Sequence, residues 1–71
     1  MEYLQDIVGR NVKAKRKAAG MNIQALANAI GAPDSTGNVT KWEKGLIVPN
    51  AYNLCALADV FGCTVDELLG R

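Results

Sequence analysis

The chain has 71 residues, close to the lower limit for a domain that folds alone, so the sequence predicts a single domain over residues 1–71. Hydrophobic residues make up 49% and charged residues 21%, with a net charge of +1, a composition that excludes an intrinsically disordered chain. No apolar run reaches the ~18 residues that cross a bilayer, and the segment after Met1 lacks a signal-peptide pattern. We therefore expect a soluble, cytoplasmic protein with no membrane partner.

Positive charge is concentrated in the first part of the chain. Residues 1–45 contain seven Lys or Arg against four Asp or Glu, whereas residues 46–71 contain one against three. Four cations fall within five residues, namely Lys13, Lys15, Arg16 and Lys17. Such a cluster contacts phosphate groups in some proteins and only solvent in others, so it leaves both interpretations open.

Five helices are predicted along the chain. Apolar residues recur at intervals of three and four, which is typical of amphipathic helices, and Gly or Pro separates the segments. No stretch shows sustained alternation of apolar and polar residues, and the run 46–48 is too short and too close to Pro49 to form a sheet. The sequence thus predicts a compact all-α domain, with helices over approximately residues 2–19, 22–30, 35–44, 50–61 and 64–70.

The first two segments carry matching start and stop signals. Gly20 and Gly31 follow them and suit the left-handed conformation after a helix, and Asn22 is the expected cap of the second segment. The residues expected to face the core are Leu4, Val8, Val12 and Ala19 in the first segment and Leu26, Ala27 and Ile30 in the second.

The third segment differs from the others because Val39 and Trp42 are its only large apolar residues. Ser35 is the expected cap, and Gly45 ends the segment. The other face is polar and carries Thr36, Asn38, Thr40, Lys41 and Lys44. Such a face suits the major groove of DNA, where base edges present donors, acceptors and methyl groups, but an ordinary surface helix has the same pattern.

The last two segments are expected to close the core. The fourth begins at Asn50 and ends at Gly62, and the fifth opens with Thr64 and Glu67 at the spacing of a capping box. Their predicted core-facing residues are Leu54, Leu57, Ala58 and Phe61, followed by Val65, Leu68 and Leu69.

The residue types needed for catalysis are missing. The chain has no histidine, no Gly-rich phosphate loop and no nucleophile beside a base, so we predict that it is not an enzyme and uses no cofactor or small-molecule substrate. Asp66 and Glu67 are helix neighbours that complement the helix dipole rather than a catalytic pair. Without histidine, Cys55 and Cys63 are too few for a tetrahedral zinc site, and we expect both to be reduced core residues.

The order of spaced residues is more specific than any short motif. The pattern covers about residues 8–70 and comprises Val8-Gly9, Val12, Arg16-Lys17, Gly20-Met21-Asn22, Leu26-Ala27, Ile30-Gly31, Val39, Trp42-Glu43-Lys44-Gly45, Pro49, Leu54, Leu57-Ala58, Phe61-Gly62 and Val65-Asp66-Glu67-Leu68-Leu69-Gly70. It resembles the Cro/C1-type (XRE-like) helix-turn-helix transcriptional regulators, which have a lambda-repressor-like DNA-binding domain. The resemblance implies that the second and third segments form the motif and that the third enters the major groove.

Carried over by position, the resemblance implies three sets of residues. The base-reading set is Ser35, Thr36, Gly37, Asn38 and Lys41. The phosphate-contacting set is Arg10, Lys17, Asn22, Gln24 and Lys44. Arg16 and Glu43 are expected to form a partly buried ion pair that joins the first helix to the end of the third.

The chemistry of the base-reading set is mixed. Asn38 can bridge an adenine, Lys41 can donate to guanine acceptors, and Thr36 can pack on a thymine methyl group or form a hydrogen bond. Gly37 has no side chain, so it can only permit close approach, and it costs about 1 kcal/mol relative to alanine inside a helix.

Three features depart from the pattern of the family. Residues 32–34 lengthen the turn between the two motif helices, which leaves the register of the third helix open. Ile23 replaces a glutamine that commonly contacts DNA. The apolar residues 46–48 follow the third helix, where the family often has polar residues, and they either fill the core or form a dimer seam. We favour a homodimer with Ile47 in its interface.

Together these observations favour a sequence-specific, DNA-binding transcriptional regulator of phage or bacterial type, acting as a repressor on a palindromic operator in double-stranded DNA. The weak net charge, Gly37, Ile23 and the apolar loop also fit a protein-interaction module, or an antitoxin, that binds little or no DNA. The sequence leaves open the operator, the regulated gene, the choice between repression and activation, and whether these residues belong to a longer regulator.

Overall fold

The computed structural model describes residues 2–71, and within that range it contains α-helices and no strand. The helices are α1 (Leu4–Ala18), α2 (Ile23–Ala29), α3 (Thr36–Glu43), α4 (Ala51–Phe61) and α5 (Val65–Leu68). The predicted all-α class and five-helix order are confirmed. The helices are shorter than predicted by one or two residues at their ends, mainly because the predicted ranges included the capping residues. Met1, where the predicted domain begins, lies outside the described residues.

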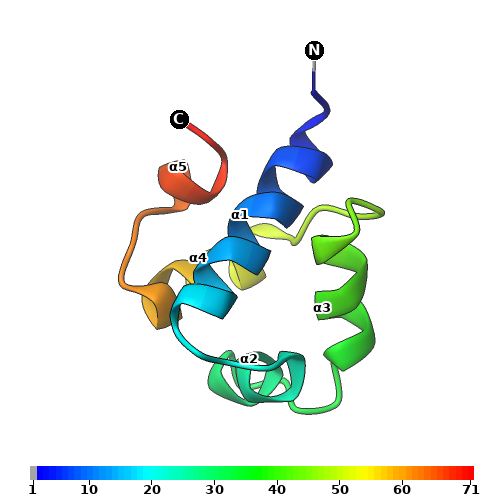
Figure 1. The fold of residues 1–71 in the computed structure, drawn as a ribbon, viewed down its shortest axis with the longest axis vertical. Helices are drawn as coiled ribbons and strands as arrows, with labels where there is room; N and C mark the ends of the chain where they lie inside the picture. Colours follow the sequence, from blue (N-terminus) through cyan, green and yellow to red (C-terminus); the bar gives the residue numbers. More distant parts are fainter. Residues whose placement is uncertain (1) are drawn as a thin grey trace.

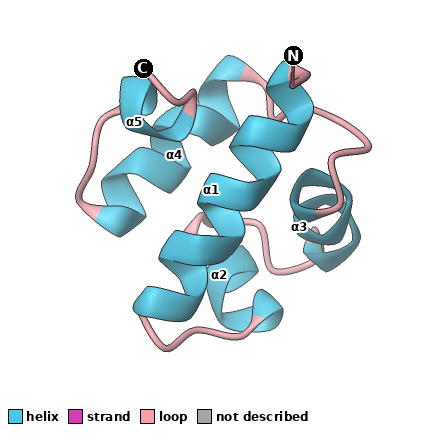
Figure 2. Cartoon of the chain, turned by 45° about the horizontal axis from the view of Figure 1, so that its top comes forward, coloured by secondary structure: helices cyan, strands magenta, loops and turns pink. Residues whose placement is uncertain are grey.

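The helices are arranged around α1, which crosses the centre of the molecule with α3 on one side and α5 on the other (Figure 1 and Figure 2). α1 contacts α3, α4 and α5, while α2 packs on α3 and α4 packs on α5. α3 is therefore held from two directions, by α1 and by α2. None of the helices in residues 2–71 is both long enough and apolar enough to span a membrane.

One continuous core lies between the helices. Its buried members come from every helix, with Ile30 at the end of α2, and are Val8, Val12, Leu26, Ala27, Ile30, Val39, Trp42, Leu57, Ala58 and Leu68. The predicted Leu54, Phe61, Val65 and Leu69 are half-buried and pack against this cluster. Burial of these apolar surfaces is what stabilises helices this short, because such helices are marginal alone.

Four residues expected in the core are more exposed than predicted. Leu4 is 45% exposed because it opens α1, beyond the part of the helix that other helices cover. Ala19 is exposed because it follows the last residue of α1, where helical spacing no longer positions it. Cys55 is exposed on α4 and Cys63 is half-buried after it, and both thiols are free. Their apolar neighbours face the core, but α4 turns Cys55 outward.

Side-chain caps fix three helix starts. Asn22 Oδ1 accepts from the Ala25 N–H at 2.7 Å, Asn50 Oδ1 accepts from the Asn53 N–H at 2.8 Å, and Thr64 Oγ1 accepts from the Glu67 N–H at 3.1 Å. Ser35 occupies the cap position of α3 without a side-chain cap bond. The predicted capping box is only half formed, because the Glu67 carboxylate lies 3.4 Å from the Lys15 ammonium instead.

Candidate nucleic-acid interface

The turn between α2 and α3 is held by hydrogen bonds. Gly31 ends α2 with φ of 78°, a left-handed conformation that favours glycine, and the next residue, Ala32, donates its N–H to the Ala27 carbonyl at 2.9 Å. Gln24 donates to the Pro33 carbonyl and to Asn28 Oδ1, both at 3.0 Å. The additional residues of this turn are thus fixed from α2, which sets where α3 begins.

α3 is anchored through one face. Val39 is fully buried and Trp42 is 3% exposed, so two side chains one turn apart attach the helix to the core. The Thr40 hydroxyl donates to the Thr36 carbonyl at 3.0 Å, which leaves that hydroxyl occupied within the helix. The Thr40 hydroxyl therefore has no free donor, and the other polar residues of α3 are the ones that can donate to a partner.

The predicted base-reading residues share this outward face to different degrees. Gly37, Asn38 and Lys41 are exposed, whereas Ser35 and Thr36 are half-buried at the start of the helix. No side chain in residues 2–71 forms a hydrogen bond or ion pair with Asn38 or Lys41 within the described contacts. The structure thus brings the five predicted residues together at the beginning and along the exposed side of α3, with Asn38 and Lys41 available for a partner.

The close packing of α1 on α3 depends on a glycine. A Cβ atom on Gly9 would overlap the Trp42 carbonyl oxygen and lie 3.1 Å from the Glu43 carbonyl oxygen. These are backbone atoms at the end of α3, so they have little freedom to move away. Gly9 consequently lets α1 lie directly against α3.

A buried ion pair joins the same two helices. Arg16 Nε lies 2.6 Å from Glu43 Oε2 and Nη2 lies 3.0 Å from Oε1, a two-point contact between side chains that are 11% and 7% exposed. The third nitrogen of the guanidinium, Nη1, donates to the Met21 carbonyl at 2.9 Å. Hydrogen bonding to Glu43 raises the pKa of Arg16, which favours the charged guanidinium. α1, the turn before α2 and the end of α3 are held together by this one side chain.

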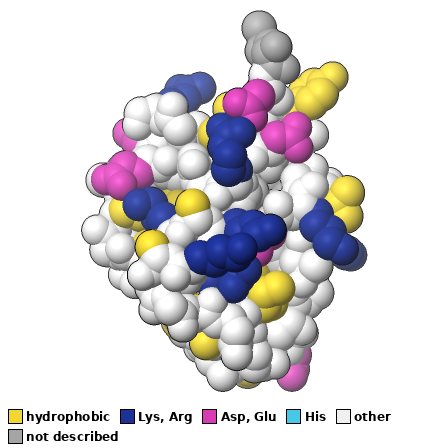
Figure 3. Space-filling view, in the orientation of Figure 1, with side chains coloured by type: hydrophobic (Ala, Val, Ile, Leu, Met, Phe, Trp, Pro, Cys, Tyr) yellow, Lys and Arg dark blue, Asp and Glu magenta, His cyan; other side chains and the backbone are white. Residues whose placement is uncertain are grey.

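Exposed cations lie on the second half of α1, on α3 and directly after α3. Lys17, Lys44 and Lys13 are exposed, and Figure 3 shows Lys and Arg side chains gathered over the middle of the face where α1 crosses the molecule. Acidic side chains lie nearer the edges of the same view. Lys13 was not in the predicted phosphate-contacting set, although its place in the basic cluster was the available signal. Exposed cations thus lie on both α1 and the end of α3, two helices that are in contact.

Two predicted phosphate-contacting residues have partners within the chain. Arg10 forms a two-point ion pair with Glu2. The hydrogen bond between them is the main cause both of the raised pKa of the Arg10 guanidinium and of the lowered pKa of the Glu2 carboxyl. Gln24 uses its amide group on the turn described above. Asn22 is exposed, and its side-chain oxygen caps α2. Lys17, Asn22 and Lys44 are therefore the freer members of the predicted set.

The loop after α3 exposes apolar side chains. Leu46 is 65%, Ile47 41% and Val48 38% exposed, and Tyr52 at the start of α4 is 77% exposed. The loop does not fill the core, which was one of the two alternatives drawn from the sequence. An apolar surface therefore lies next to the polar face of α3 in the chain.

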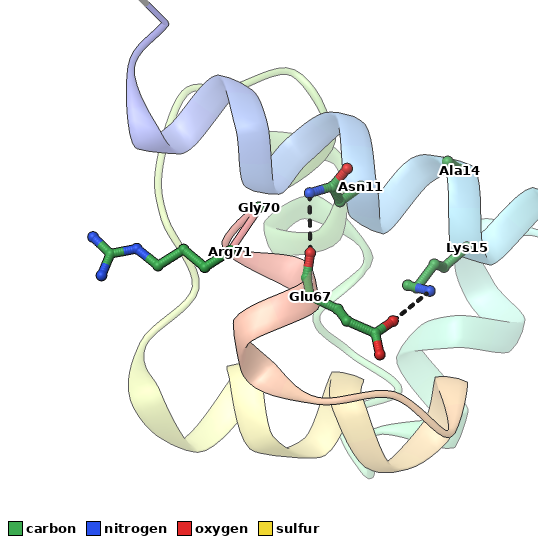
Figure 4. Close-up of a pocket in the computed structure, with 6 residues that line it drawn as sticks. All are labelled: Asn11, Ala14, Lys15, Glu67, Gly70 and Arg71. Atoms are coloured by element: carbon green, nitrogen blue, oxygen red, sulfur yellow. Dashed lines mark hydrogen bonds and ion pairs between the residues drawn. The ribbon is translucent and has the colours of Figure 1, made fainter.

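A hollow lies on the side of α1 away from α3, between α1 and α5 (Figure 4). Asn11 points into it and donates to the carbonyl oxygens of Glu67 and Leu68 at 3.3 and 3.1 Å. Lys15 and Glu67 close one end, and Arg71 points away from the pair. These contacts connect helices within the chain, and sequence reasoning did not identify Asn11 because its partners are distant in sequence.

The comparisons with known proteins agree with this geometry. A sequence profile described as helix-turn-helix matches residues 12–68, which is most of the chain. The chain belongs to the helix-turn-helix family, of the Cro/C1 type. Among solved structures, it is similar to the P22 c2 repressor protein, crystallised in complex with a synthetic operator, with a TM-score of 0.79 and 31% sequence identity over 86% of this chain and 89% of that one. No curated protein sequence matches the chain.

Proposed function

We propose that this helix-turn-helix protein is a DNA-binding transcription regulator that represses its target by reading the major groove with α3. One observation carries the proposal: α3 is fixed by Val39, Trp42 and Glu43 on its inner face, while its outer face offers unpaired polar side chains beside exposed lysines. A rigidly held helix with a polar outer face can place donors and acceptors against base edges. The similarity to a repressor bound to its operator supports the same function.

Each base-reading residue has a proposed role. Asn38 bridges an adenine, and Lys41 donates to the acceptors of a guanine. Thr36 contacts a thymine methyl group or forms a hydrogen bond, and Ser35 lies at the beginning of the helix with its hydroxyl not used for capping. Gly37 provides close approach.

Phosphate contacts are proposed mainly for the freer cations. Lys17 near the end of α1, Lys44 directly after α3 and Asn22 at the beginning of α2 are all exposed. Arg10 and Gln24 contribute less, because a phosphate must first displace Glu2 from Arg10 and the Pro33 carbonyl from Gln24.

Salt dependence of binding tests the function. We expect the affinity for a duplex selected from a random pool to fall steeply with salt, with a slope of log affinity against log salt of about −0.9 per phosphate contact. Lys17→Gln reduces that slope by about one contact. Lys15→Gln is the matched control, since Lys15 lies on the same helix but pairs with Glu67 of α5. The proposal is contradicted if the wild-type protein binds no duplex, or if its affinity for a duplex does not change with salt. Either result favours a protein-interaction module.

A second part of the proposal is a homodimer on a palindromic operator. The exposed residues Leu46, Ile47 and Val48 support it, because an apolar loop beside the recognition helix can join two copies whose α3 helices lie one DNA turn, ~34 Å, apart. Ile47→Asp is expected to lower the mass measured by sedimentation of the complex with DNA. Leu4→Asp, at another exposed apolar residue, is the control. Equal masses for wild type and Ile47→Asp contradict the dimer.

A further inference from the structure

Gly37 has no role in the folded chain itself. Its φ is not among the positive values that five other glycines adopt, and a Cβ atom built on it meets no heavy atom within 4 Å. By contrast, a Cβ atom on Gly9 would overlap the backbone at the end of α3. A glycine inside a helix destabilises it relative to alanine, because the unfolded chain gains conformational freedom. The fold therefore tolerates a side chain at position 37 and would be more stable with one.

The position of Gly37 on α3 suggests why a glycine stands there despite its effect on stability. It lies in the first turn of α3, on the exposed face that also carries Asn38 and Lys41. Lys41, four residues later, lies on the same side of the helix. Without a side chain at position 37, the backbone of the first turn is the outermost part of the helix there.

We infer that Gly37 is a specificity-determining residue, at which a base-pair edge comes into van der Waals contact with the backbone of α3. This inference rests on the proposed DNA-binding function. Asn38 has a short side chain and reaches an adenine only if the backbone lies close to the groove floor. Lys41 has a long, flexible side chain and keeps its reach when the helix lies further out. A side chain at position 37 thus removes the Asn38 contact before the Lys41 contact.

Two variants at this position test the inference on a duplex selected with the wild-type protein. Gly37→Ala and Gly37→Leu are both expected to fold and to melt slightly higher than wild type, by less than a substitution in a helix interior because Gly37 lies in the first turn. Gly37→Ala loses about tenfold in affinity, and Gly37→Leu loses more, because one base contact is lost and the helix is held away. Cys55→Ala, at an exposed position on α4, is the control and keeps the wild-type affinity.

A double substitution separates this role from a general loss of binding. Asn38→Ala weakens binding in the wild-type background but adds little to Gly37→Ala, because that contact is already gone, whereas Lys41→Ala weakens binding in both backgrounds. Gly37→Ala with wild-type affinity overturns the inference and leaves the proposed function intact. Lower thermal stability of Gly37→Ala also overturns it, since the fold would then need the glycine. Wild-type protein that binds no duplex overturns the proposed function and this inference together.

Discussion

The two faces of α3 are built under different constraints. The inner face carries Val39 and Trp42 in the core and Glu43 in a buried ion pair, so each of its side chains has a partner within the chain. The outer face carries Gly37, Asn38 and Lys41, which are exposed and which folding leaves free to vary. The stability of the fold therefore accounts for the residues on the inner face but not for those on the outer face.

The largest expected effect on stability comes from removing the ion pair on the inner face of α3. Arg16→Ala leaves the Glu43 carboxylate buried without its partner and the Met21 carbonyl without its donor, so we expect a loss of about 3–5 kcal/mol in the free energy of unfolding. Urea denaturation followed by circular dichroism measures it. Arg10→Ala is the matched control, because Arg10 also belongs to α1 and pairs with a glutamate but is exposed, and its midpoint should be unchanged.

Replacing both partners sharpens this test. The double variant Arg16→Met, Glu43→Leu leaves no unpaired charge, and we expect it to recover most of the stability that Arg16→Ala loses. Wild-type stability in Arg16→Ala would show that the pair does not hold α1 to α3.

The next effect compares one substitution at two helical glycines. Gly9→Ala forces a Cβ atom against the backbone at the end of α3 and is expected to destabilise the chain by about 1–3 kcal/mol, as in other overpacked cores. The same change at Gly37 is expected to stabilise the chain, because a Cβ atom there meets no other atom. Thermal denaturation of both variants measures the difference, and equal midpoints would contradict the assignment of the two faces.

A change on the outer face should leave stability almost untouched. Lys41→Ala removes an exposed side chain, so the free energy of unfolding stays within about 0.5 kcal/mol of wild type. Under the proposed function, the affinity for the selected duplex falls by about 1–3 kcal/mol and preference at one base pair relaxes. Fluorescence anisotropy with matched and single-mismatch duplexes measures both. A stability loss as large as that of Arg16→Ala would contradict the comparison.

The smallest effect concerns the exposed pair between Glu2 and Arg10. Glu2→Gln releases the Arg10 guanidinium, and we expect an unchanged melting temperature together with a small increase in affinity for DNA. Glu2→Gln in an Arg10→Ala background is the control and should add nothing. Weaker binding after Glu2→Gln would show that the pair does not compete with phosphate.

Local features of the sequence predicted most of the fold. The helical spacing of apolar residues predicted the five helices, and short-range chemistry identified the caps at Asn22 and Thr64 and the beginning of the fourth helix near Asn50. The exposure of Cys55 was not predictable from its apolar neighbours, because which flank of α4 faces inward depends on how α4 lies against α1 and α5.

The candidate site was predictable in position but not in detail. The pattern of the family placed the polar face of α3, yet the partners of Arg10 and Gln24 depend on how segments separated in sequence meet. A side chain's type indicates what it can donate, whereas its freedom to donate depends on the tertiary contacts that surround it.

The bond from Asn11 to the last carbonyls of α5 has a consequence for the order in which the molecule opens. A helix of four residues is not stable in water by itself. α5 is therefore stabilised by its contacts, namely the hydrogen bonds from Asn11 of α1 and the burial of Leu68 in the core. Amide protons near the C-terminus should therefore exchange with solvent sooner than those at the centre of α1, and Asn11→Ala should speed that exchange while leaving α3 protected.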